Sequence, residues 1–293
     1  MKNSLEKIKT LFAHQKVCIA YLTAGDGGAE RTINAALALI EGGVHLLELG
    51  IPFSDPIADG SVIQQATARA LQGGTHLKQV LEIMQALRKK TDIPLVLFSY
   101  YNPILAASTS FDFFKEASEA GADGLLIVDC PFEESYAVKQ KCGEHQLAFI
   151  HVVTPSTSME RLAIINKHAQ GFLYYACRKG TTGVRSGLPD DFSQKIAALK
   201  SETSLPVVVG FGISDHATAQ QVLGAADGVV VGSLFVKALA EGADAKKLTA
   251  LAKTIFTSTN VPLVETVEEL RSLENQRRHH LKIISNLKSQ QDN

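Results

Sequence analysis

Two carboxylates, Glu48 and Asp59, stand at the two ends of a short rigid segment and are the residues of this chain best suited to acid–base chemistry. Glu48 lies near the end of an apolar run, 44–49, that has the composition of a buried strand. Pro52 and Pro56 follow, and proline fixes its own φ and biases the preceding residue towards extended backbone. Asp59 closes the segment just before a helical pattern. A carboxylate among leucines is costly to bury unless it has a partner or a task, so this segment points to a functional site.

The same two residues also have purely structural interpretations. Glu48 can form a salt bridge in a protein core, and Asp59 can cap the helix that follows it. Carboxylates in unusual surroundings indicate active sites only probabilistically. From these residues alone, the structural and the catalytic interpretations both stay open.

Short apolar runs alternate with helical patterns along the chain. Most runs are apolar throughout, as in parallel strands that are buried on both faces. Eight strand–helix units without a linker between them favour one closed (β/α)8 barrel, an α/β fold of roughly 250 residues. An open, doubly wound sheet is the alternative, but its glycine-rich phosphate loop is expected after the first strand, where this chain has Thr-Ala-Gly-Asp-Gly-Gly. Strands are expected at 17–23, 44–49, 95–100, 124–128, 148–153, 171–175, 207–210 and 228–231, with helices at 29–41, 77–89, 111–120, 135–142, 159–168, 192–199 and 217–223.

Composition argues against several classes of partner. The chain has 293 residues and a net charge of −1, and its charges are dispersed, so we expect neither nucleic acid nor a membrane as a partner. No apolar run approaches the ~18 residues of a spanning helix, and the charged N-terminus lacks the apolar core of a signal peptide. The four cysteines and nine histidines show no metal-ligand spacing, which predicts a cytoplasmic protein with reduced thiols and no metal site.

Glycines follow the last two expected strands, where barrels often bind phosphate. Gly212 comes after the strand at 207–210, and Gly232 with Ser233 comes after the strand at 228–231. Glycine lets the backbone approach an anion, and the free N–H groups at a helix start donate to it. These glycines can also be ordinary turn residues, but their place after these two strands favours a phosphate site.

The chain resembles the alpha subunits of tryptophan synthase over roughly residues 1 to 260. The resemblance implies a TIM barrel, at 1–264, with an extra N-terminal helix at 5–14. It also implies a retro-aldol cleavage of indole-3-glycerol phosphate to indole and glyceraldehyde 3-phosphate. The motifs that carry it are Glu48-Leu-Gly-Ile-Pro-Phe-Ser-Asp-Pro-Ile-Ala-Asp59-Gly, Tyr100-Tyr-Asn-Pro103, Asp129-x-Pro-x-Glu-Glu134, Gly183-x-x-x-Gly-Leu-Pro189, Gly210-Phe-Gly-Ile-Ser214 and Gly232-Ser233.

By this resemblance Glu48 is the general acid and base, Asp59 faces the indole nitrogen, and Tyr174 helps to position the reacting centre. One proton-shuttling carboxylate and one fixed carboxylate can perform this cleavage without a metal or a cofactor in this chain. Phe98 and Leu126 are either indole contacts or ordinary barrel core. The remaining implied residues are Gly183, Gly212, Gly232 and Ser233 for the phosphate, Phe211 for the indole pocket, and Arg178 and Thr182 in a lid at 178–189, for which a rigid surface loop is the alternative.

The family works as a complex in which indole passes through a tunnel to a beta subunit that carries pyridoxal phosphate. The resemblance therefore implies an α2β2 heterotetramer, with the loop 52–59 and a loop from Asn102 onward facing the beta subunit. The segment 102–110 lacks a glycine that is common in the family at this loop. Gly27 and Ser61 stand where proline is common, and neither change removes a catalytic group.

The C-terminal segment has the pattern of a charged helix. Residues 265–293 show apolar residues at helical spacing among many charges, which favours a charged amphipathic helix packed on the barrel over a partner-binding helix.

Two other functions are alternatives to the lyase. One rival function is another phosphosugar barrel, such as an isomerase, epimerase or synthase. The other is a non-catalytic regulatory subunit. The presence of both Glu48 and Asp59 argues against each.

Overall fold

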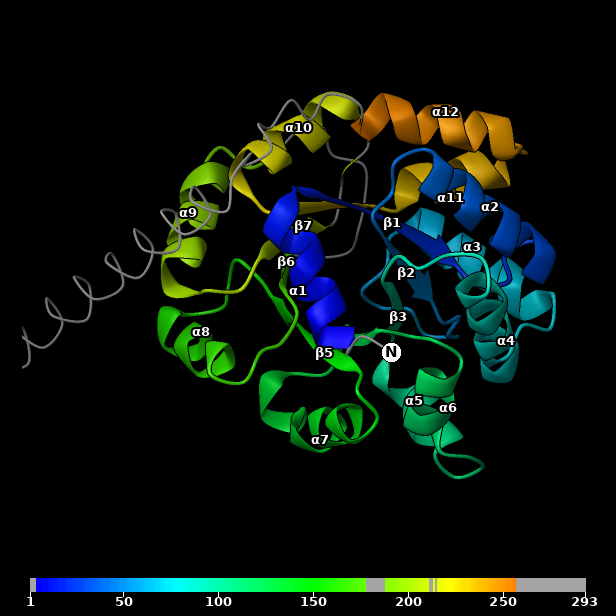
Figure 1. Cartoon of the computed structure of the whole chain (residues 1–293), viewed down its shortest axis with the longest axis horizontal. Helices are drawn as coiled ribbons and strands as arrows, with labels where there is room; N and C mark the ends of the chain where they lie inside the picture. The colour runs from blue at the N-terminus through cyan, green and yellow to red at the C-terminus, as the bar shows by residue number, and fades with distance from the viewer. Residues whose placement is uncertain (1–3, 178–187, 211–212, 214, 257–293) are drawn as a thin grey trace, which may run out of the picture. The chain divides into compact units, whose positions relative to one another are not determined.

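The computed structural model describes residues 4–177, 188–210, 213 and 215–256 of the chain. They form a closed barrel of eight parallel strands in the order β1 to β8, with β8 paired to β1 (Figure 1). The chain divides into two units, Met1–Thr259 and Asn260–Asn293, and described residues occur only in the first. The predicted end of the barrel at residue 264 and the predicted tail at 265–293 lie outside the described residues and stay predictions.

One helix precedes the barrel, and at least one helix follows each strand. The strands are β1 (Val17–Thr23), β2 (Leu46–Gly50), β3 (Leu95–Ser99), β4 (Gly124–Ile127), β5 (Ala148–Val153), β6 (Leu173–Ala176), β7 (Val207–Gly210) and β8 (Gly228–Val231). The α-helices are α1 (Ser4–His14), α2 (Ala29–Glu41), α3 (Ser61–Gln72), α4 (Leu77–Arg88), α5 (Tyr101–Ala107), α6 (Phe113–Glu119), α7 (Tyr136–Glu144), α8 (Met159–Asn166), α9 (Phe192–Glu202), α10 (His216–Ala225), α11 (Ser233–Ala240) and α12 (Ala245–Phe256), and a 3-10 helix, η1, spans Phe132–Glu134.

All eight predicted strands are confirmed, and the closed strand order rules out the doubly wound sheet. The largest shifts are at the starts of β2, predicted at 44–49, and of β6, predicted at 171–175. Gly171 has a φ of 65°, so the chain still turns there and β6 begins later. The helix predicted at 5–14 is α1.

The prediction of a loop from Asn102 onward is wrong, because helix α5 begins at Tyr101. Pro103 lies in the first turn of α5, where a missing N–H is tolerated because the first N–H groups of a helix have no partner within it. The N–H of Tyr101 donates a hydrogen bond to Oδ1 of Asp129 at 2.8 Å, which satisfies one of these groups. A proline so close to a helix start is therefore no sign of a loop.

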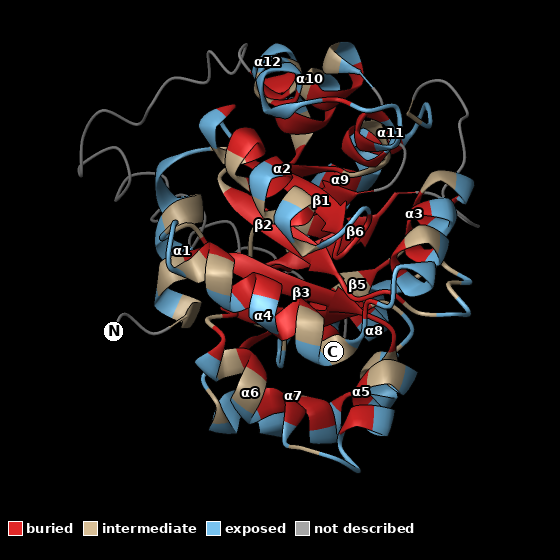
Figure 2. Cartoon of the chain, turned by 90° about the vertical axis from the view of Figure 1, so that its right-hand side faces the viewer, coloured by how far each residue is buried: buried red, intermediate tan, exposed pale blue. Residues whose placement is uncertain are grey.

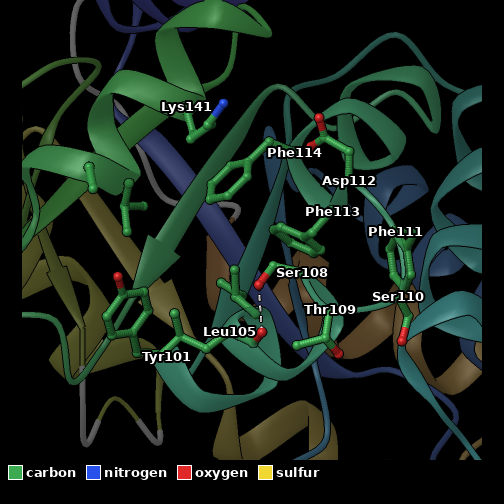
Figure 3. A pocket seen from close by; sticks show the side chains of 13 residues that line it. Tyr101, Leu105, Ser108, Thr109, Ser110, Phe111, Asp112, Phe113, Phe114 and Lys141 are labelled. Carbon is green, nitrogen blue, oxygen red and sulfur yellow. Dashed lines mark hydrogen bonds between the residues drawn. The ribbon is translucent and has the colours of Figure 1, made fainter.

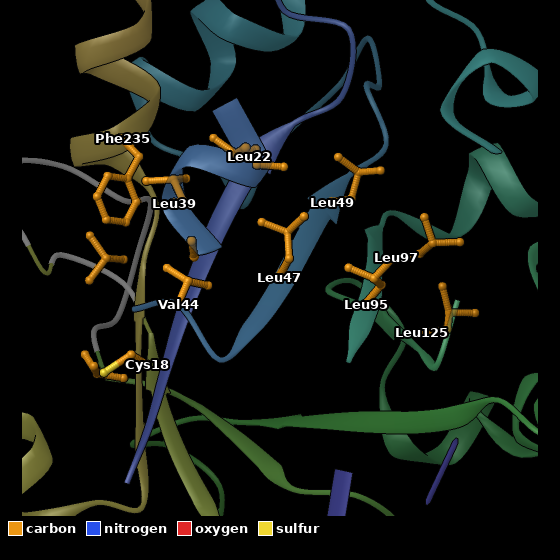
Figure 4. Packing of buried hydrophobic residues seen from close by; sticks show 14 of the residues in the cluster. Cys18, Leu22, Leu39, Val44, Leu47, Leu49, Leu95, Leu97, Leu125 and Phe235 are labelled. Atoms are coloured by element: carbon orange, nitrogen blue, oxygen red, sulfur yellow. The ribbon is translucent and has the colours of Figure 1, made fainter. Parts of the chain in front are cut away.

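Apolar side chains fill the barrel in two layers, because successive residues of a strand point to opposite faces. The outer layer packs the strands against the helices, and Figure 4 shows part of it, including Leu22, Leu47 and Leu97. The inner layer fills the barrel axis and includes Ile19 and Phe98. In Figure 2 the strands are buried, whereas the helices are buried on one side and exposed on the other. Only inner-layer positions of a strand can therefore bring a side chain to the barrel axis.

Helix α1 closes the N-terminal end of the inner layer. Ile8 is fully buried, and Phe12 packs on Phe172 with the ring centroids 5.5 Å apart. Lys7 donates hydrogen bonds to both carboxylate oxygens of Asp123, at 3.1 and 3.0 Å. Figure 1 shows α1 lying over the middle of the barrel. This end of the barrel is thus covered, and the opposite end remains for a site.

Two aspartates repeat one arrangement at the covered end. Asp123 precedes β4 and accepts a hydrogen bond from the N–H of Leu95 in β3, and Asp227 precedes β8 and accepts one from the N–H of Val207 in β7, both at 2.9 Å. Each ties a strand to its neighbour at the end where barrels place stabilising residues. Each also pairs with two basic residues, Lys7 and Arg88 for Asp123, and Lys16 and Lys200 for Asp227.

Replacing Asp123 with Ala leaves Lys7, Arg88 and the N–H of Leu95 without their shared acceptor. Removing one partner of a buried ion pair costs roughly 3–5 kcal/mol, and less when the cations reach solvent, so we expect the free energy of unfolding in urea to fall by about 2–4 kcal/mol. The control, Glu119→Ala, removes an exposed pair with Lys115 and should cost less than about 1 kcal/mol. Equal losses in the two variants would contradict the role given to Asp123.

Candidate active site

A small cavity of about 40 Å³ lies inside the barrel and contains both predicted carboxylates. It opens at the C-terminal ends of the strands, where barrel enzymes place their active sites. Inward side chains of the strands form its walls, and neighbouring loops and helices contribute the rest. The lining residues are Tyr21, Glu48, Asp59, Ile63, Phe98, Tyr174, Ile213, Val230, Gly232 and Ser233.

Glu48 faces the inside of the barrel because it lies in register with Tyr21 of β1 and Val96 of β3, which both belong to the inner layer. Its side chain is 0% exposed, and neither carboxylate oxygen has a hydrogen-bond partner among the described residues. Burial disfavours the charged form and raises the pKa of Glu48 to about 8. Glu48 is therefore mainly a protonated acid at neutral pH, and the described residues give it no salt bridge.

Asp59 reaches the same cavity from the end of the loop 52–59. Its side chain is also buried, but the hydroxyl of Tyr100 donates a hydrogen bond to its Oδ2 at 3.0 Å. Burial raises the pKa of Asp59 to about 6, and the hydrogen bond from Tyr100 opposes that rise. Asp59 is thus largely ionised at neutral pH. It does not cap α3, which begins after Gly60 with no side-chain cap among the described contacts.

The two carboxyl groups therefore differ in charge at neutral pH although they line one cavity. Enzymes assign an acid role and a charged role to two carboxyl groups by giving them different surroundings in this way. The protonated Glu48 can donate a proton, and the ionised Asp59 can stabilise a positive charge. The arrangement suits a reaction in which a proton is delivered while positive charge develops nearby.

Two tyrosines wall the cavity, and each depends on a glycine in the neighbouring strand. Tyr174, a predicted site residue on β6, has its hydroxyl over Gly210 of β7, where a Cβ would overlap that oxygen. Tyr21 of β1 stands in the same relation to Gly50 of β2. Even alanine at either glycine would displace a tyrosine, so these two glycines shape the cavity.

Gly232 and Ser233, predicted to bind phosphate, line the same cavity. Ser233 is the first residue of α11, and the first N–H groups of a helix are available to an anion because they have no partner within the helix. Gly232 lies against Tyr21, since an added Cβ would be 3.2 Å from the Cβ of Tyr21. Both predicted phosphate residues that the structure describes thus lie beside the two carboxylates.

Of the two residues that were either indole contacts or barrel core, Phe98 lines the cavity, whereas Leu126 is buried in the inner layer and is not among the lining residues.

Five predicted site residues fall outside the described residues, and their roles stay predictions. They are Arg178, Thr182, Gly183, Phe211 and Gly212.

Two tyrosines of the site were not predicted from the sequence. Tyr100 contacts Asp59, and it stands in the Tyr-Tyr-Asn-Pro motif that the resemblance uses. Tyr21 lines the cavity, and its place two residues after Ile19 on β1 puts both on the same face of the strand. The period of two along that strand is the sequence signal that could have identified Tyr21.

The described part of the chain offers neither a cluster of metal ligands nor a membrane-spanning helix. Within the described ranges, no three His, Cys, Asp or Glu side chains are grouped so as to hold a metal ion. No helix of those ranges is both long enough and apolar enough to span a bilayer. All four cysteines carry thiols.

Known proteins share both the sequence and the fold of this chain. The sequence pattern of the tryptophan synthase alpha chain matches residues 9–264. The chain belongs to the tryptophan synthase alpha chain family. A tryptophan synthase alpha chain from Coxiella burnetii (strain CbuK_Q154) is 49% identical over 251 residues, which cover 86% of this chain and 97% of that protein.

Solved structures of the family show the same barrel. The alpha subunit from Legionella pneumophila str. Paris is 38% identical, with a TM-score of 0.75 over 86% of this chain and 95% of that one. A chain of the tryptophan synthase α2β2 complex from Pyrococcus furiosus is 37% identical, with a TM-score of 0.75 over 83% of this chain and 97% of that one. The predicted family and fold are confirmed, and this alpha chain is a lyase of tryptophan biosynthesis.

Replacing Glu48 with Gln should change stability in a pH-dependent way. The pKa of Glu48 is about 8 in the folded chain against an ordinary 4.5, so between these values the folded state holds a proton that the unfolded state has released. Over that range the free energy of unfolding of the wild type should fall by up to about 1.4 kcal/mol per pH unit from this group. Because Gln does not titrate, the stability of Glu48→Gln relative to wild type should rise from about pH 5 to about pH 8 and then level off.

Urea denaturation of both proteins across this range measures the difference. Glu119→Gln is the matched control, because it makes the same substitution at an exposed side chain. A constant difference between wild type and Glu48→Gln over the whole range would contradict the raised pKa of Glu48.

Proposed function

We propose that this alpha chain cleaves indole-3-glycerol phosphate to indole and glyceraldehyde 3-phosphate in a retro-aldol reaction. One observation carries the proposal. The carboxyl group of Glu48, fully buried and without a hydrogen-bond partner among the described residues, lines the same cavity as the ionised carboxylate of Asp59. This pair can deliver a proton to an apolar ring and stabilise the cation that results.

The proposed steps close a proton cycle on Glu48. Glu48 gives its proton to the indole carbon that bears the glycerol phosphate chain, and Asp59 stabilises the positive charge that develops on the ring nitrogen. The side-chain hydroxyl next to the bond then gives its proton to the Glu48 carboxylate as a carbonyl forms. The electron pair of the broken C–C bond returns to the ring and neutralises it. Indole and glyceraldehyde 3-phosphate leave, and Glu48 is protonated as at the start.

The phosphate of the substrate is assigned to Gly232 and Ser233, together with the predicted Gly183 and Gly212. The first turn of α11 supports this assignment, because its N–H groups start at Ser233 beside the cavity. The phosphate then lies on the α11 side of the cavity, and the indole ring lies towards Asp59.

The ring is assigned to Tyr174, Phe98 and the predicted Phe211, with Arg178 and Thr182 in a lid over the substrate. The cavity of about 40 Å³ is much smaller than the roughly 300–1,000 Å³ of typical ligand pockets. We therefore expect substrate binding to displace side chains of the cavity wall, and a lid that closes afterwards would exclude water.

The proposal includes a partner and a compartment. The relative from Pyrococcus furiosus is part of an α2β2 complex with mutual activation, which supports a tryptophan synthase beta subunit as the partner of this chain. The pyridoxal phosphate of the complete reaction then belongs to that beta subunit, and this chain needs no cofactor for the cleavage. The four thiols fit a reducing compartment, and we place the enzyme in the cytoplasm.

The two rival functions predict different chemistry. Another phosphosugar barrel would bind the phosphate at Gly232 and Ser233 but release no indole. A regulatory subunit would bind the substrate and activate its partner without using the proton of Glu48. The protonated Glu48 beside the ionised Asp59 supports the lyase over a regulatory subunit, which needs no such pair. An isomerase or epimerase can also use an acid and a carboxylate base, so release of indole is the property that separates it from the lyase.

Glu48→Gln and Asp59→Asn keep the shape of each side chain and remove its proton or its charge. Loss of a positioned acid or base typically costs about 10²–10⁴ in rate, so we expect kcat for indole release from indole-3-glycerol phosphate to fall by that factor in each variant. Affinity for a substrate analogue should change little, because the phosphate residues are intact. The assay is run with and without a beta subunit.

Glu119→Gln, a carboxylate on an exposed surface, serves as the control and should keep full activity. Near-normal turnover in Glu48→Gln or Asp59→Asn would remove that residue from the mechanism. If the wild type released no indole under either condition, the lyase proposal would be wrong for this chain. A Glu48→Gln complex as active as the wild-type complex would favour the regulatory subunit.

A further inference from the structure

Tyr100 makes three contacts to the loop that carries Asp59. Its hydroxyl donates a hydrogen bond to Oδ2 of Asp59 and accepts one from the N–H of Ala58, both at 3.0 Å. Its ring packs on Phe53, with centroids 5.3 Å apart. Phe53 lies at the start of the loop 52–59 and Ala58 near its end, so one side chain holds the loop at both ends.

The other described contacts of this loop hold its main chain and not the Asp59 carboxylate. Ser54 and Asp55 are exposed, and Ile57 is 72% exposed. The amide of Gln64 donates to the backbone carbonyl of Asp59 at 2.9 Å, which fixes the main chain but leaves the carboxylate free to rotate. Among the described residues, the hydroxyl of Tyr100 is the hydrogen-bond donor recorded on the Asp59 carboxylate itself.

Tyr100 is in turn held rigidly. It is 3% exposed and directly precedes α5, whose first N–H group, from Tyr101, donates to Asp129. The next tyrosine, Tyr101, has a different setting: its side chain lines a surface cavity of about 590 Å³ beside α5 and α6 (Figure 3). The two adjacent tyrosines are therefore a matched pair for mutagenesis. The side chain of Tyr100 contacts the loop that carries Asp59, and the side chain of Tyr101 lines the surface cavity.

We propose that Tyr100 is a positioning residue for the reaction, which acts through Asp59 by keeping that carboxylate ionised and turned towards the cavity. The inference rests on the proposed function and deepens it, since it adds a residue that acts through another. Among the described residues, three other titratable side chains line the cavity with Asp59: Glu48 from β2, Tyr21 from β1 and Tyr174 from β6. All three are acids, so none supplies the positive charge that would replace the hydrogen bond from Tyr100.

The hydrogen bond from Tyr100 decides in which direction the pKa of Asp59 changes when the hydroxyl is removed. A hydrogen bond to the charged form of an acid favours that form, and the bond from Tyr100 lowers the pKa of Asp59 against the effect of burial. Without the hydroxyl, the pKa of Asp59 rises further above its ordinary value of 3.8. If the reaction needs Asp59 ionised, activity is then lost at a higher pH than in the wild type.

The test is the pH dependence of indole release by Tyr100→Phe and by the control Tyr101→Phe. The activity of the wild type should fall below about pH 6 as Asp59 is protonated and above about pH 8 as Glu48 is deprotonated. In Tyr100→Phe the acid limb should move up by about one pH unit, given the usual strength of a hydrogen bond to a charged group. At pH values below both acid limbs, kcat of Tyr100→Phe should then be about tenfold lower than that of the wild type, whereas KM should change little. Tyr101→Phe should follow the wild type.

A direct titration of Asp59 separates this proposal from the lyase proposal. Carbon-13 NMR of aspartate-labelled protein, with Asp59→Asn to assign the signal, reports the pKa of Asp59 without any turnover. A higher pKa in folded Tyr100→Phe, matched by a shifted acid limb, supports the positioning role. An unshifted pKa, or a lower kcat at every pH with an unshifted limb, would overturn it. A wild type that releases no indole would refute the lyase instead, whatever the titration shows.

Discussion

The carboxyl group of Glu48, buried inside a closed barrel without a hydrogen-bond partner among the described residues, is the feature on which the rest of the site depends. A lone carboxylate in such a place is disfavoured, so the group holds its proton and its pKa rises to about 8. This holds only while water and cations are kept away. Inner-layer neighbours on both adjacent strands exclude them at the level of Glu48, and α1 covers the far end of the barrel.

The same cavity holds a second carboxylate, Asp59, in its charged form, and the hydroxyl of Tyr100 helps to keep it charged. Asp59 arrives on a loop rather than on a strand, so its position is not fixed by the barrel register. The hydroxyl of Tyr100 supplies both the position and part of the compensation for burial. A strand thus carries the acid and a loop carries the charged group, which lets the two groups differ in pKa within one cavity.

Stability and chemistry are placed at opposite ends of the barrel. Asp123 and Asp227 tie β3 to β4 and β7 to β8 at the N-terminal end, each with two basic partners. The C-terminal end instead carries glycines where strands need room for tyrosines, at Gly50 and Gly210. The covered end can therefore carry many ion pairs, while the open end keeps an acid that has no partner in the described part of the chain.

The eight strands could be predicted from the sequence because parallel strands buried on both faces read as continuous apolar runs. Glu48 and Asp59 could also be selected, because a charge among leucines and a proline-stiffened loop are local signals. The tyrosine–glycine pairs could not, since they depend on the register between strands that are adjacent in space, such as Tyr174 over Gly210. Helix α5 was wrongly predicted as a loop, because the resemblance placed a loop from Asn102 onward, whereas Pro103 lies in the first turn of a helix, where proline is tolerated. The phosphate and lid residues at 178–187 and 211–212 lie outside the described residues and stay predictions.

The protonation state of Glu48 is the central claim, and infrared difference spectroscopy tests it most directly. The carbonyl stretch of a protonated carboxyl group, isolated as the difference between the wild type and Glu48→Gln, should be present at neutral pH. We expect it to disappear with a midpoint near about pH 8. A midpoint close to 4.5, the ordinary pKa of a glutamate, would show that Glu48 is ionised at neutral pH and would contradict this account of the site.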